Sequence, residues 1–308
     1  MSTHRLIFFG SSEHSARLLT DVLRQDWCEI VAVVTRPAPQ QGHRHQADTP
    51  VVAIAEAAGI PVWRPHHPDD AIADIQAAKV SAGLLFAYGK ILSDALIAAF
   101  PQGIINVHPS LLPRHRGPSP IEATILSGDT EAGTTIMLIT REMDSGPILQ
   151  QARFPIVLDI SKKELWEKLY QASLSALSEA APAYLAGDRQ PHSQPETGVS
   201  YCKLVRKTDG AVDLNAESAI SLERKIRAYA DWPKVRIPIR LNTTATELIL
   251  LAAKLDSHTC PTPRLIRQKH TTQLCLPDGS LSLIRVQLPG RQPIDGADLA
   301  NVQSLELA

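Results

Sequence analysis

The strongest constraint on how this chain can fold is a series of short apolar segments in the first third of its 308 residues. The four clearest are Arg5–Phe9, Glu29–Val34, Val80–Phe86 and Ile104–Val107, and a shorter one surrounds Val62. They are apolar at nearly every position instead of at alternate positions, which is typical of strands that are covered on both faces. The pattern predicts an α/β fold in which a mostly parallel sheet lies between layers of helices.

Helices are expected between these strands, because the intervening segments carry start and stop signals. Ser11 or Ser12 can cap the first helix, and Gly59 follows the second. The predicted helices cover His14–Leu23, Val51–Ala58, Asp69–Ala78 and Ser93–Phe100. Ligands of such sheets bind beyond the carboxyl ends of the strands, so the segments that follow the strands are the candidates for chemistry.

The pattern changes after residue 107. A short helix (Pro120–Ser127), two strands (Thr134–Ile139 and Ile148–Ile156) and a long helix (Lys162–Leu185) are expected there. The polar stretch Asp188–Val199 contains two prolines and is typical of a linker. The predicted organisation is therefore a catalytic domain over 1–187, a linker over 188–205 and a second domain over 206–308.

The second domain has a different texture. One helix, Ser218–Tyr229, precedes short alternating runs separated by turn signals such as Pro277-Asp278-Gly279. The runs cover Arg236–Leu241, Glu247–Leu255, Gln273–Pro277 and Ser280–Val286. This spacing predicts a smaller β-rich domain, of barrel type.

Composition excludes several classes of protein. Hydrophobic residues make up 44% of the chain and charged residues 20%, which is ordinary for a globular protein and not for a disordered one. No apolar run is long enough for a membrane span, and the N-terminus lacks the pattern of a signal peptide. The net charge of −1 argues against a general nucleic-acid packager. Residues 206–308 nevertheless carry a net charge of +3, which is either ordinary surface variation or a domain that faces a polyanion.

The four cysteines, Cys28, Cys202, Cys260 and Cys275, form no CxxC pair and have no histidine at zinc-finger spacing. We therefore expect four ordinary thiols in a reducing, cytoplasmic setting and no metal site.

The densest candidate for chemistry is the segment Gly103–Pro120, where a buried strand ends in Asn106-Val107-His108. Alternation along a strand directs Asn106 and His108 to the same face. An asparagine amide can donate to an oxygen that gains charge, and an imidazole can move a proton near neutral pH. Each could instead be a satisfied structural group, but a strand-end loop rich in Pro and Gly favours function.

A second candidate is Asp144, in the turn between the two later strands. A carboxylate beside an imidazole would orient the ring and favour its charged form. The alternative is that Asp144 only supports the Ser145-Gly146 turn. Spacing alone does not decide whether Asp144 reaches His108. A third strand end, Phe86–Leu92, is either a ligand loop or a plain strand-to-helix turn.

Other motifs are absent or weak. The chain has no dinucleotide fingerprint, no P-loop and no nucleophile elbow. His66 and His67 lie in a proline-bounded loop and are more typical of a solvated turn than of a metal site. The group His43-Arg44-His45, in the loop Thr35–Pro50, is either solvated or an arm that reaches an anion.

Three of these segments together resemble a known family. The sequences A-Y-G-x-I-L at 87–92, N-x-H-P-S-L-L-P at 106–113 and D-S-G at 144–146 match, in order and spacing, the signature of the 10-formyltetrahydrofolate-dependent formyltransferases. The later segments Tyr201–Leu204, Lys207–Asp213 and Ile226–Pro233 are similar to the tRNA-directed branch of that family. The resemblance covers nearly the whole chain.

The resemblance implies a Rossmann-like catalytic domain, a C-terminal barrel of OB type and an enzyme. Members of this branch transfer the formyl group of 10-formyltetrahydrofolate, a co-substrate, to the amine of methionine on initiator methionyl-tRNA for translation initiation. It further implies a cytoplasmic monomer with no metal and no membrane contact. The alternative is formyl transfer to a sugar nucleotide or another small amine. A folate- or RNA-binding protein without turnover is a third possibility, against which the three polar residues argue.

The resemblance also implies roles for individual residues. The implied catalytic residues are Asn106, His108 and Asp144, with a protonated His108 and Asn106 stabilising an oxyanion. The implied folate-binding residues are Tyr88, Gly89, Lys90, Ile91, Leu92, Ser110, Leu111, Leu112, Pro113, Arg141, Glu142 and Met143. The implied tRNA-binding residues are Arg36, His43 and Arg44. The loop Thr35–Pro50 departs from the branch because it has no lysine, which predicts weaker or different contacts with tRNA phosphates.

Overall fold

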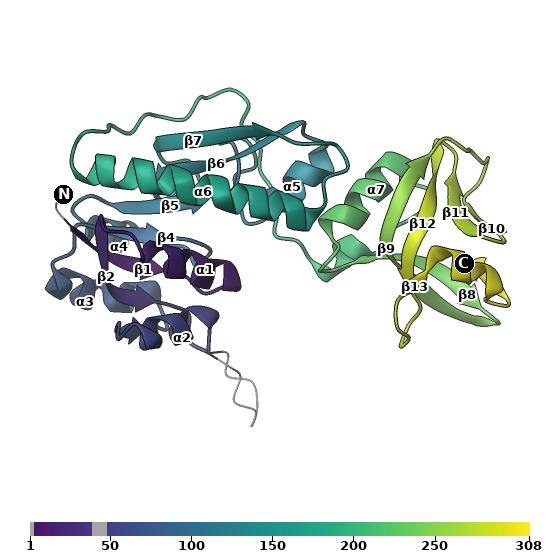
Figure 1. Ribbon diagram of the computed structural model, residues 1–308, viewed down its shortest axis with the longest axis horizontal. Helices are drawn as coiled ribbons and strands as arrows, with labels where there is room; N and C mark the ends of the chain where they lie inside the picture. The colour runs from purple at the N-terminus through teal and green to yellow at the C-terminus, as the bar shows by residue number, and fades with distance from the viewer. Residues whose placement is uncertain (1–2, 39–47) are drawn as a thin grey trace. The chain divides into compact units, whose positions relative to one another are not determined.

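The computed structural model describes residues 3–38 and 48–308. The chain divides into two units, drawn together in Figure 1. The first consists of Met1–Pro120, Glu131–Pro155 and Glu167–Cys202. The second consists of Ile121–Thr130, Ile156–Trp166 and Lys203–Ala308, so the two units interleave along the sequence.

The first unit is built on one mixed sheet. Its strands are β1 (His4–Phe9), β2 (Cys28–Val34), β3 (Val62–Trp63), β4 (Ala82–Leu85), β5 (Ile104–His108), β6 (Glu131–Leu138) and β7 (Ile148–Pro155). They lie in the order β3-β2-β1-β4-β5-β6-β7. The pairs from β3 to β5 are parallel, whereas β6 is antiparallel to both β5 and β7. The prediction of a mostly parallel, Rossmann-like sheet is thus confirmed.

The helices before residue 187 follow the predicted order. They are α1 (Glu13–Val22), α2 (Pro50–Ala57), α3 (Ile72–Ala78), α4 (Asp94–Ala98), α5 (Pro120–Ser127) and α6 (Lys162–Leu185). The helix expected over Asp69–Ala78 is α-helical only from Ile72, because its first turn, Pro68–Ala71, is a 3₁₀ helix capped by His67.

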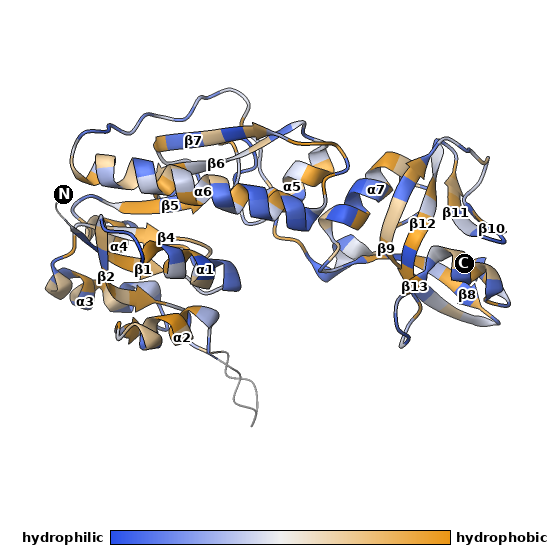
Figure 2. Ribbon diagram, in the orientation of Figure 1, coloured by the Kyte–Doolittle hydropathy of each residue, from blue (hydrophilic) through white to orange (hydrophobic). Residues whose placement is uncertain are grey.

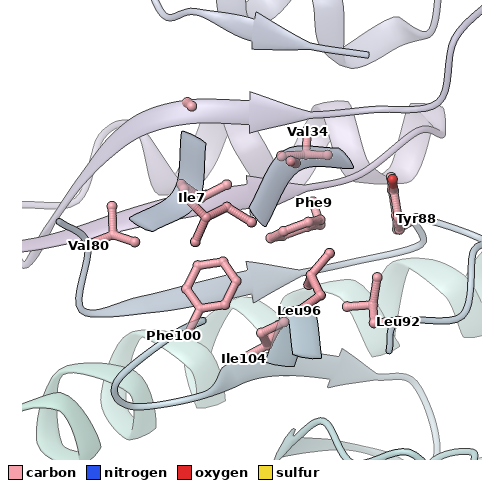
Figure 3. Close-up of a cluster of buried hydrophobic side chains, with 12 residues drawn as sticks. Ile7, Phe9, Val34, Val80, Tyr88, Leu92, Leu96, Phe100 and Ile104 are labelled. Atoms are coloured by element: carbon pink, nitrogen blue, oxygen red, sulfur yellow. The ribbon is translucent and has the colours of Figure 1, made fainter. Parts of the chain in front are cut away.

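One face of the sheet is closed by a hydrophobic cluster (Figure 3). Ile7 and Phe9 of β1 contribute to it, and the Phe9 ring makes T-shaped contacts with Tyr88 and Phe100 at centroid distances of 5.6 and 5.9 Å. Leu92 belongs to the same cluster. The segment after β4 is therefore anchored in the core at two positions.

The start of α1 is fixed against the end of β4. Ser12 caps the helix by accepting from the Ser15 backbone N–H at 3.1 Å, and the Ser15 hydroxyl donates to the Phe86 carbonyl at 2.6 Å. A Cβ at Gly10 would lie 2.5 Å from the Ser15 Cβ, so glycine is what permits this close approach. The carboxyl ends of β1 and β4 are thereby held together at the edge where ligands are expected.

The second unit contains α7 (Ala219–Ala228) and an antiparallel sheet. Its strands are β8 (Val235–Leu241), β9 (Thr244–Asp256), β10 (Arg264–Gln268), β11 (Thr271–Leu276), β12 (Gly279–Gln287), β13 (Ile294–Asp295) and β14 (Leu305–Leu307). Two 3₁₀ helices cover Lys207–Gly210 and Gly296–Asn301. The order is β10-β11-β12-β9-β8-β14, with β13 paired to β12. The edge strands β10 and β14 contact each other, so the sheet is nearly closed and the predicted smaller barrel is confirmed.

The strands of the first sheet are more continuously buried than those of the second, and Figure 2 shows the hydropathy of both. Every residue of β5 is buried, whereas burial alternates along β8. The predictions missed β10, β13 and β14, because β10 carries three polar residues among five and the other two strands have only two or three residues.

The expectation of four free thiols is wrong for two cysteines. A disulfide joins Cys260, in the loop after β9, to Cys275 of β11, with their Cα atoms 5.7 Å apart. Cys28 and Cys202 are free. The barrel brings the pair together across 15 residues, a separation that carries no recognisable motif. His258 lies within 4.8 Å of both sulfurs, which the disulfide already occupies.

No helix in the described parts of the chain combines the length and the apolar character needed to cross a bilayer.

Candidate active site

The site is built on the end of β5. Asn106 and His108 are both about 5% exposed, on a strand flanked by β4 and β6. The backbone at His108 is held from α6, because Ser173 donates to the Thr134 hydroxyl at 2.8 Å and Thr134 donates to the His108 carbonyl at 3.1 Å. The strand end is therefore a rigid platform for the two side chains.

The imidazole of His108 bridges two loops. Its Nε2 lies 3.0 Å from the His115 carbonyl oxygen, and its Nδ1 lies 3.7 Å from Oδ1 of Asp144. A carbonyl oxygen only accepts, so Nε2 carries the hydrogen and donates it. The nitrogen that can gain or lose a proton is consequently Nδ1, the one that faces the carboxylate. The distance of 3.7 Å is longer than a direct hydrogen bond.

Burial lowers the pKa of His108 below its ordinary value of 6.5. The Asp144 charge and the hydrogen bond to the His115 carbonyl oppose this shift, and the nearby His115 ring reinforces it. His108 is therefore neutral at pH 7 in the resting site. The protonated His108 that the resemblance implies beside an oxyanion stays a prediction, and it requires that the ring gain its proton during the reaction.

Asp144 occupies a strained turn after β6. Its φ is +49°, a left-handed conformation that is uncommon for a residue with a side chain. Its Oδ2 accepts from the Gly117 backbone N–H at 2.8 Å. A Cβ at Gly146 would lie 1.9 Å from the Leu138 carbonyl oxygen, so the turn packs closely against the end of β6. The structure brings Asp144 beside His108, which spacing left open.

Two residues that the sequence reasoning missed complete this arrangement. Gln194 donates from Nε2 to the carbonyls of Asp144 and Gly146, at 2.8 and 2.9 Å. Its Oε1 accepts from Nε and Nη2 of Arg116, at 3.1 and 2.7 Å. Arg116 lies in the dense motif segment, but Gln194 lies in the expected linker, where no sequence signal distinguishes it.

Asn106 differs from its neighbours because its amide makes no hydrogen bond to any residue in the described ranges. It is buried at the strand end that carries His108. A buried amide without a protein partner is available to a bound molecule.

The segment Tyr88–Leu92, expected to bind folate, divides into an anchor and a tip. Tyr88 and Leu92 are buried in the hydrophobic cluster, whereas Ile91 is 80% exposed. Gly89 has a φ of +75°, and the ammonium group of Lys90 donates to the His66 carbonyl at 2.6 Å. The tip presents backbone and one apolar side chain to solvent.

The segment Ser110–Pro113 is held by a different set of contacts. The Ser110 hydroxyl donates to the Arg114 carbonyl at 2.7 Å. Thr135 donates to the Ser110 carbonyl at 2.7 Å and accepts from the Leu112 N–H at 3.1 Å. Leu112 packs in a small buried cluster with Met137 and Ile148, and Leu111 lies against Gly133. The Leu112–Pro113 bond is cis.

The third expected folate segment, Arg141–Met143, is exposed. Arg141 and Glu142 line a pocket of about 710 Å³ between the turn at 140–147 and the stretch at 193–199. Arg116 and Gln194 also line it, so this pocket adjoins the contacts that hold Asp144. The guanidinium of Arg141 pairs with Asp94 at 3.4 Å, and Met143 is half exposed.

Of the residues expected to bind tRNA, Arg36 lies at the same edge of the sheet. Its backbone N–H donates to the Ser11 hydroxyl at 3.2 Å, and its Nη1 would be 3.5 Å from a Cβ placed at Gly89. His43 and Arg44 lie outside the described residues.

Two family models match the chain. The model described as Formyl transferase matches residues 4–181, and the model described as Formyl transferase, C-terminal domain, matches residues 204–304. Together they cover Asn106, His108, Asp144 and Arg116, whereas Gln194 lies in the interval between the two matches.

Curated relatives match over nearly the full length. A methionyl-tRNA formyltransferase of Roseiflexus sp. (strain RS-1) is 35% identical over 300 residues, which cover 96% of this chain and 91% of that protein. The protein of the same name from Herpetosiphon aurantiacus is 33% identical, and the one from Myxococcus xanthus is 31% identical. The alignments cover 96% and 97% of this chain and 96% and 95% of those proteins.

Solved structures share the fold at low identity. An N-formyltransferase of Helicobacter canadensis, in complex with folinic acid and dTDP-3-aminofucose, has a TM-score of 0.64 at 15% identity. The alignment covers 92% of this chain and 99% of that one. WlaRD, a sugar 3N-formyl transferase in the presence of dTDP and 5-N-formyl-THF, has a TM-score of 0.65 at 16% identity, covering 95% and 100%. These likenesses concern the fold alone.

Proposed function

This chain belongs to the formyl transferase family, and we propose that it transfers the formyl group of 10-formyltetrahydrofolate to the amino group of methionine on initiator methionyl-tRNA. It is an enzyme of formyl transfer, since both family models and the full-length relatives agree. The observation that supports the tRNA substrate best is the 35% identity across 96% of the chain to relatives of that name, including the second unit.

A folate co-substrate is part of the proposal. The Helicobacter protein and WlaRD were both crystallised with reduced folates. In this chain the exposed backbone at Gly89–Ile91 and the segment Arg141–Met143 would bind the folate, and Asn106 offers a buried amide with no partner in the described ranges. These residues fit a flat, hydrogen-bonding ligand that carries a reactive carbonyl group.

The proposed chemistry begins with attack of the methionine amine on the formyl carbon. As the C–N bond forms, the carbonyl π pair moves to oxygen, and the Asn106 amide donates to that oxyanion. The attacking nitrogen then carries a proton that it must lose. Neutral His108 can accept it at Nδ1, directly or through a water that Asp144 also holds.

Proton transfer to His108 places a positive charge beside the oxyanion. His108 becomes an imidazolium beside the oxyanion, and the Asp144 carboxylate stabilises this cation. The oxyanion pair then re-forms the carbonyl as the bond from the formyl carbon to N10 breaks, and His108 returns the proton to N10 of the leaving folate. The imidazole is neutral again at the end, so this scheme needs no covalent intermediate on the protein.

Recognition of tRNA would rest on the second unit and on the edge near Arg36. Residues 206–308 carry a net charge of +3, which suits a polyanion. A cytoplasmic location belongs to the same proposal, because charged initiator tRNA is a substrate of the translation apparatus. The proposal also takes the enzyme to act as a monomer.

The direct test is transfer of labelled formyl from 10-formyltetrahydrofolate to initiator methionyl-tRNA, with elongator methionyl-tRNA and a dTDP-amino sugar as competing acceptors. We expect initiator tRNA to be formylated fastest, with a rate at low tRNA concentration that falls steeply as salt is raised. Rapid formylation of the amino sugar and none of either tRNA would support the small-amine alternative instead.

A further inference from the structure

We propose that Gln194 is a positioning residue that holds the Asp144 carboxylate at its working distance from His108. The proposal rests on the proposed function, because it gives Gln194 a part in the same formyl transfer. It also makes the stretch 192–202, expected to be a passive linker, a structural part of the active site.

The amide of Gln194 is fully used. Its Nε2 donates to two carbonyls of the turn, those of Asp144 and Gly146, and its Oε1 accepts two bonds from Arg116. A flipped amide would direct its oxygen at the two carbonyls and its hydrogens at the guanidinium. The contacts therefore determine one orientation of the side chain, and through it the position of the turn.

The turn needs such support because of its backbone conformation. Asp144 adopts a φ of +49°, a left-handed conformation that aspartate tolerates better than most residues and that hydrogen bonds from the surroundings stabilise. Gln194 donates to the carbonyl of Asp144 itself and to that of Gly146, on the two sides of Ser145. Without it, two carbonyls lose their donor and the turn is free to relax.

Three consecutive residues connect this support to the imidazole. The His115 carbonyl accepts from His108, the Arg116 side chain binds Gln194, and the Gly117 N–H binds Oδ2 of Asp144. The segment 115–117 therefore contacts both catalytic side chains, and the 3.7 Å gap between them depends on it.

The same segment is fastened to the stretch after α6. The Arg116 N–H donates to the Ser200 carbonyl at 2.9 Å, and the Cys202 N–H donates to the Arg116 carbonyl at 2.7 Å. A Cβ at Gly117 would lie 2.3 Å from the Cys202 carbonyl oxygen, so these two segments of the chain are in close contact. Residues 192–202 thus secure both ends of the arrangement, through Gln194 at the turn and through the backbone at Arg116.

The consequence is electrostatic. The titratable groups that act on His108 are Asp144, from the turn after β6, and His115, from the loop after β5. Asp144 favours the imidazolium against burial and against His115. If Asp144 moves away, the pKa of His108 falls further, and proton transfer to Nδ1 becomes less favourable.

The test compares Gln194→Met with Gln190→Met, a matched control at an exposed glutamine of the expected linker 188–205. In formyl transfer by the full chain, we expect Gln194→Met to lower kcat by on the order of tenfold to a hundredfold, with the KM values little changed. The acid limb of its kcat/KM profile moves to lower pH. The control keeps the kcat and the profile of the wild type.

A second measurement does not depend on turnover. The pKa of His108, followed by NMR through its ring Cε1 proton and assigned with His108→Ala, is lower in Gln194→Met than in the wild type and the control. If the wild type formylates no amine, the proposed function fails, yet this titration still tests the positioning role. Gln194→Ala, which removes the donor and adds no charge, gives the same result should Gln194→Met not fold. An unchanged His108 pKa and kcat in a folded Gln194 variant, or an equal loss in the control, overturns the proposal.

Discussion

Two strand-end segments of the first unit are expected to serve one reaction, yet they are built differently. In Asn106–Pro113, hydrogen bonds with β6 and with the His115 carbonyl fix the backbone and the imidazole. In Phe86–Leu92, Tyr88 and Leu92 are buried in the hydrophobic cluster of Figure 3 and the tip between them is exposed. Groups that react need polar atoms at fixed distances, whereas a binding surface needs only a backbone presented on an apolar anchor.

The largest effect is expected at Asn106. Asn106→Ala should lower kcat by about a hundred- to a thousandfold, because an oxyanion donor is lost. Its stability should change little beyond the loss of packing, since the amide has no partner in the described ranges. Steady-state formyl transfer together with thermal unfolding checks both parts. A variant with nearly the wild-type kcat would remove Asn106 from the catalytic group.

The next effect concerns pH. The folded-state pKa of His108 is below the unfolded value of 6.5, so below about pH 6.5 the unfolded chain binds a proton that the native site resists. The contribution of His108 to stability is therefore complete above pH 6.5 and is lost as the pH falls towards the native pKa. The acid limb of kcat/KM should likewise lie below pH 6.5.

Denaturant unfolding between pH 7.5 and pH 5 measures this dependence. His108→Gln should lose less stability over that range than the wild type does. A wild type that gains stability relative to His108→Gln as the pH falls would contradict the assigned direction.

A smaller effect tests the anchor of the other segment. The Tyr88 hydroxyl is buried with no partner among the described residues, and burial raises the pKa of Tyr88 to about 12. Tyr88→Phe should therefore leave the free energy of unfolding unchanged or raise it by up to about 1 kcal/mol. Tyr88→Ala, the control, should cost about 3–5 kcal/mol because a large side chain leaves the core. A marked rise in the KM for folate with Tyr88→Phe would show that the hydroxyl binds the ligand.

The smallest effect is expected at the tip. Ile91→Ser should raise the KM for 10-formyltetrahydrofolate a few-fold while changing the free energy of unfolding by no more than about 0.5 kcal/mol. Ile284→Ser is a matched control, because Ile284 is an exposed isoleucine of the second unit. Equal effects of the two changes on the folate KM would remove the distinction between an anchor and a binding tip.

The sequence by itself determined the strands of the first sheet and the placement of Asn106 and His108 at one strand end. Their apolar neighbours identify β5 as a strand buried on both faces, and the period of two directs both side chains to one side. The formyl transferase signature could also be recognised in the sequence, because its residues lie within short segments.

Only the tertiary structure decided which segments meet. Asp144 reaches His108, Gln194 reaches Asp144 across 50 residues, and Cys260 reaches Cys275 through the curvature of the barrel. Periodicity reports which positions an element buries, but the distance between two loops depends on how the whole sheet packs. The pKa of His108 is a property of the same kind, since desolvation arises from every element that surrounds the ring.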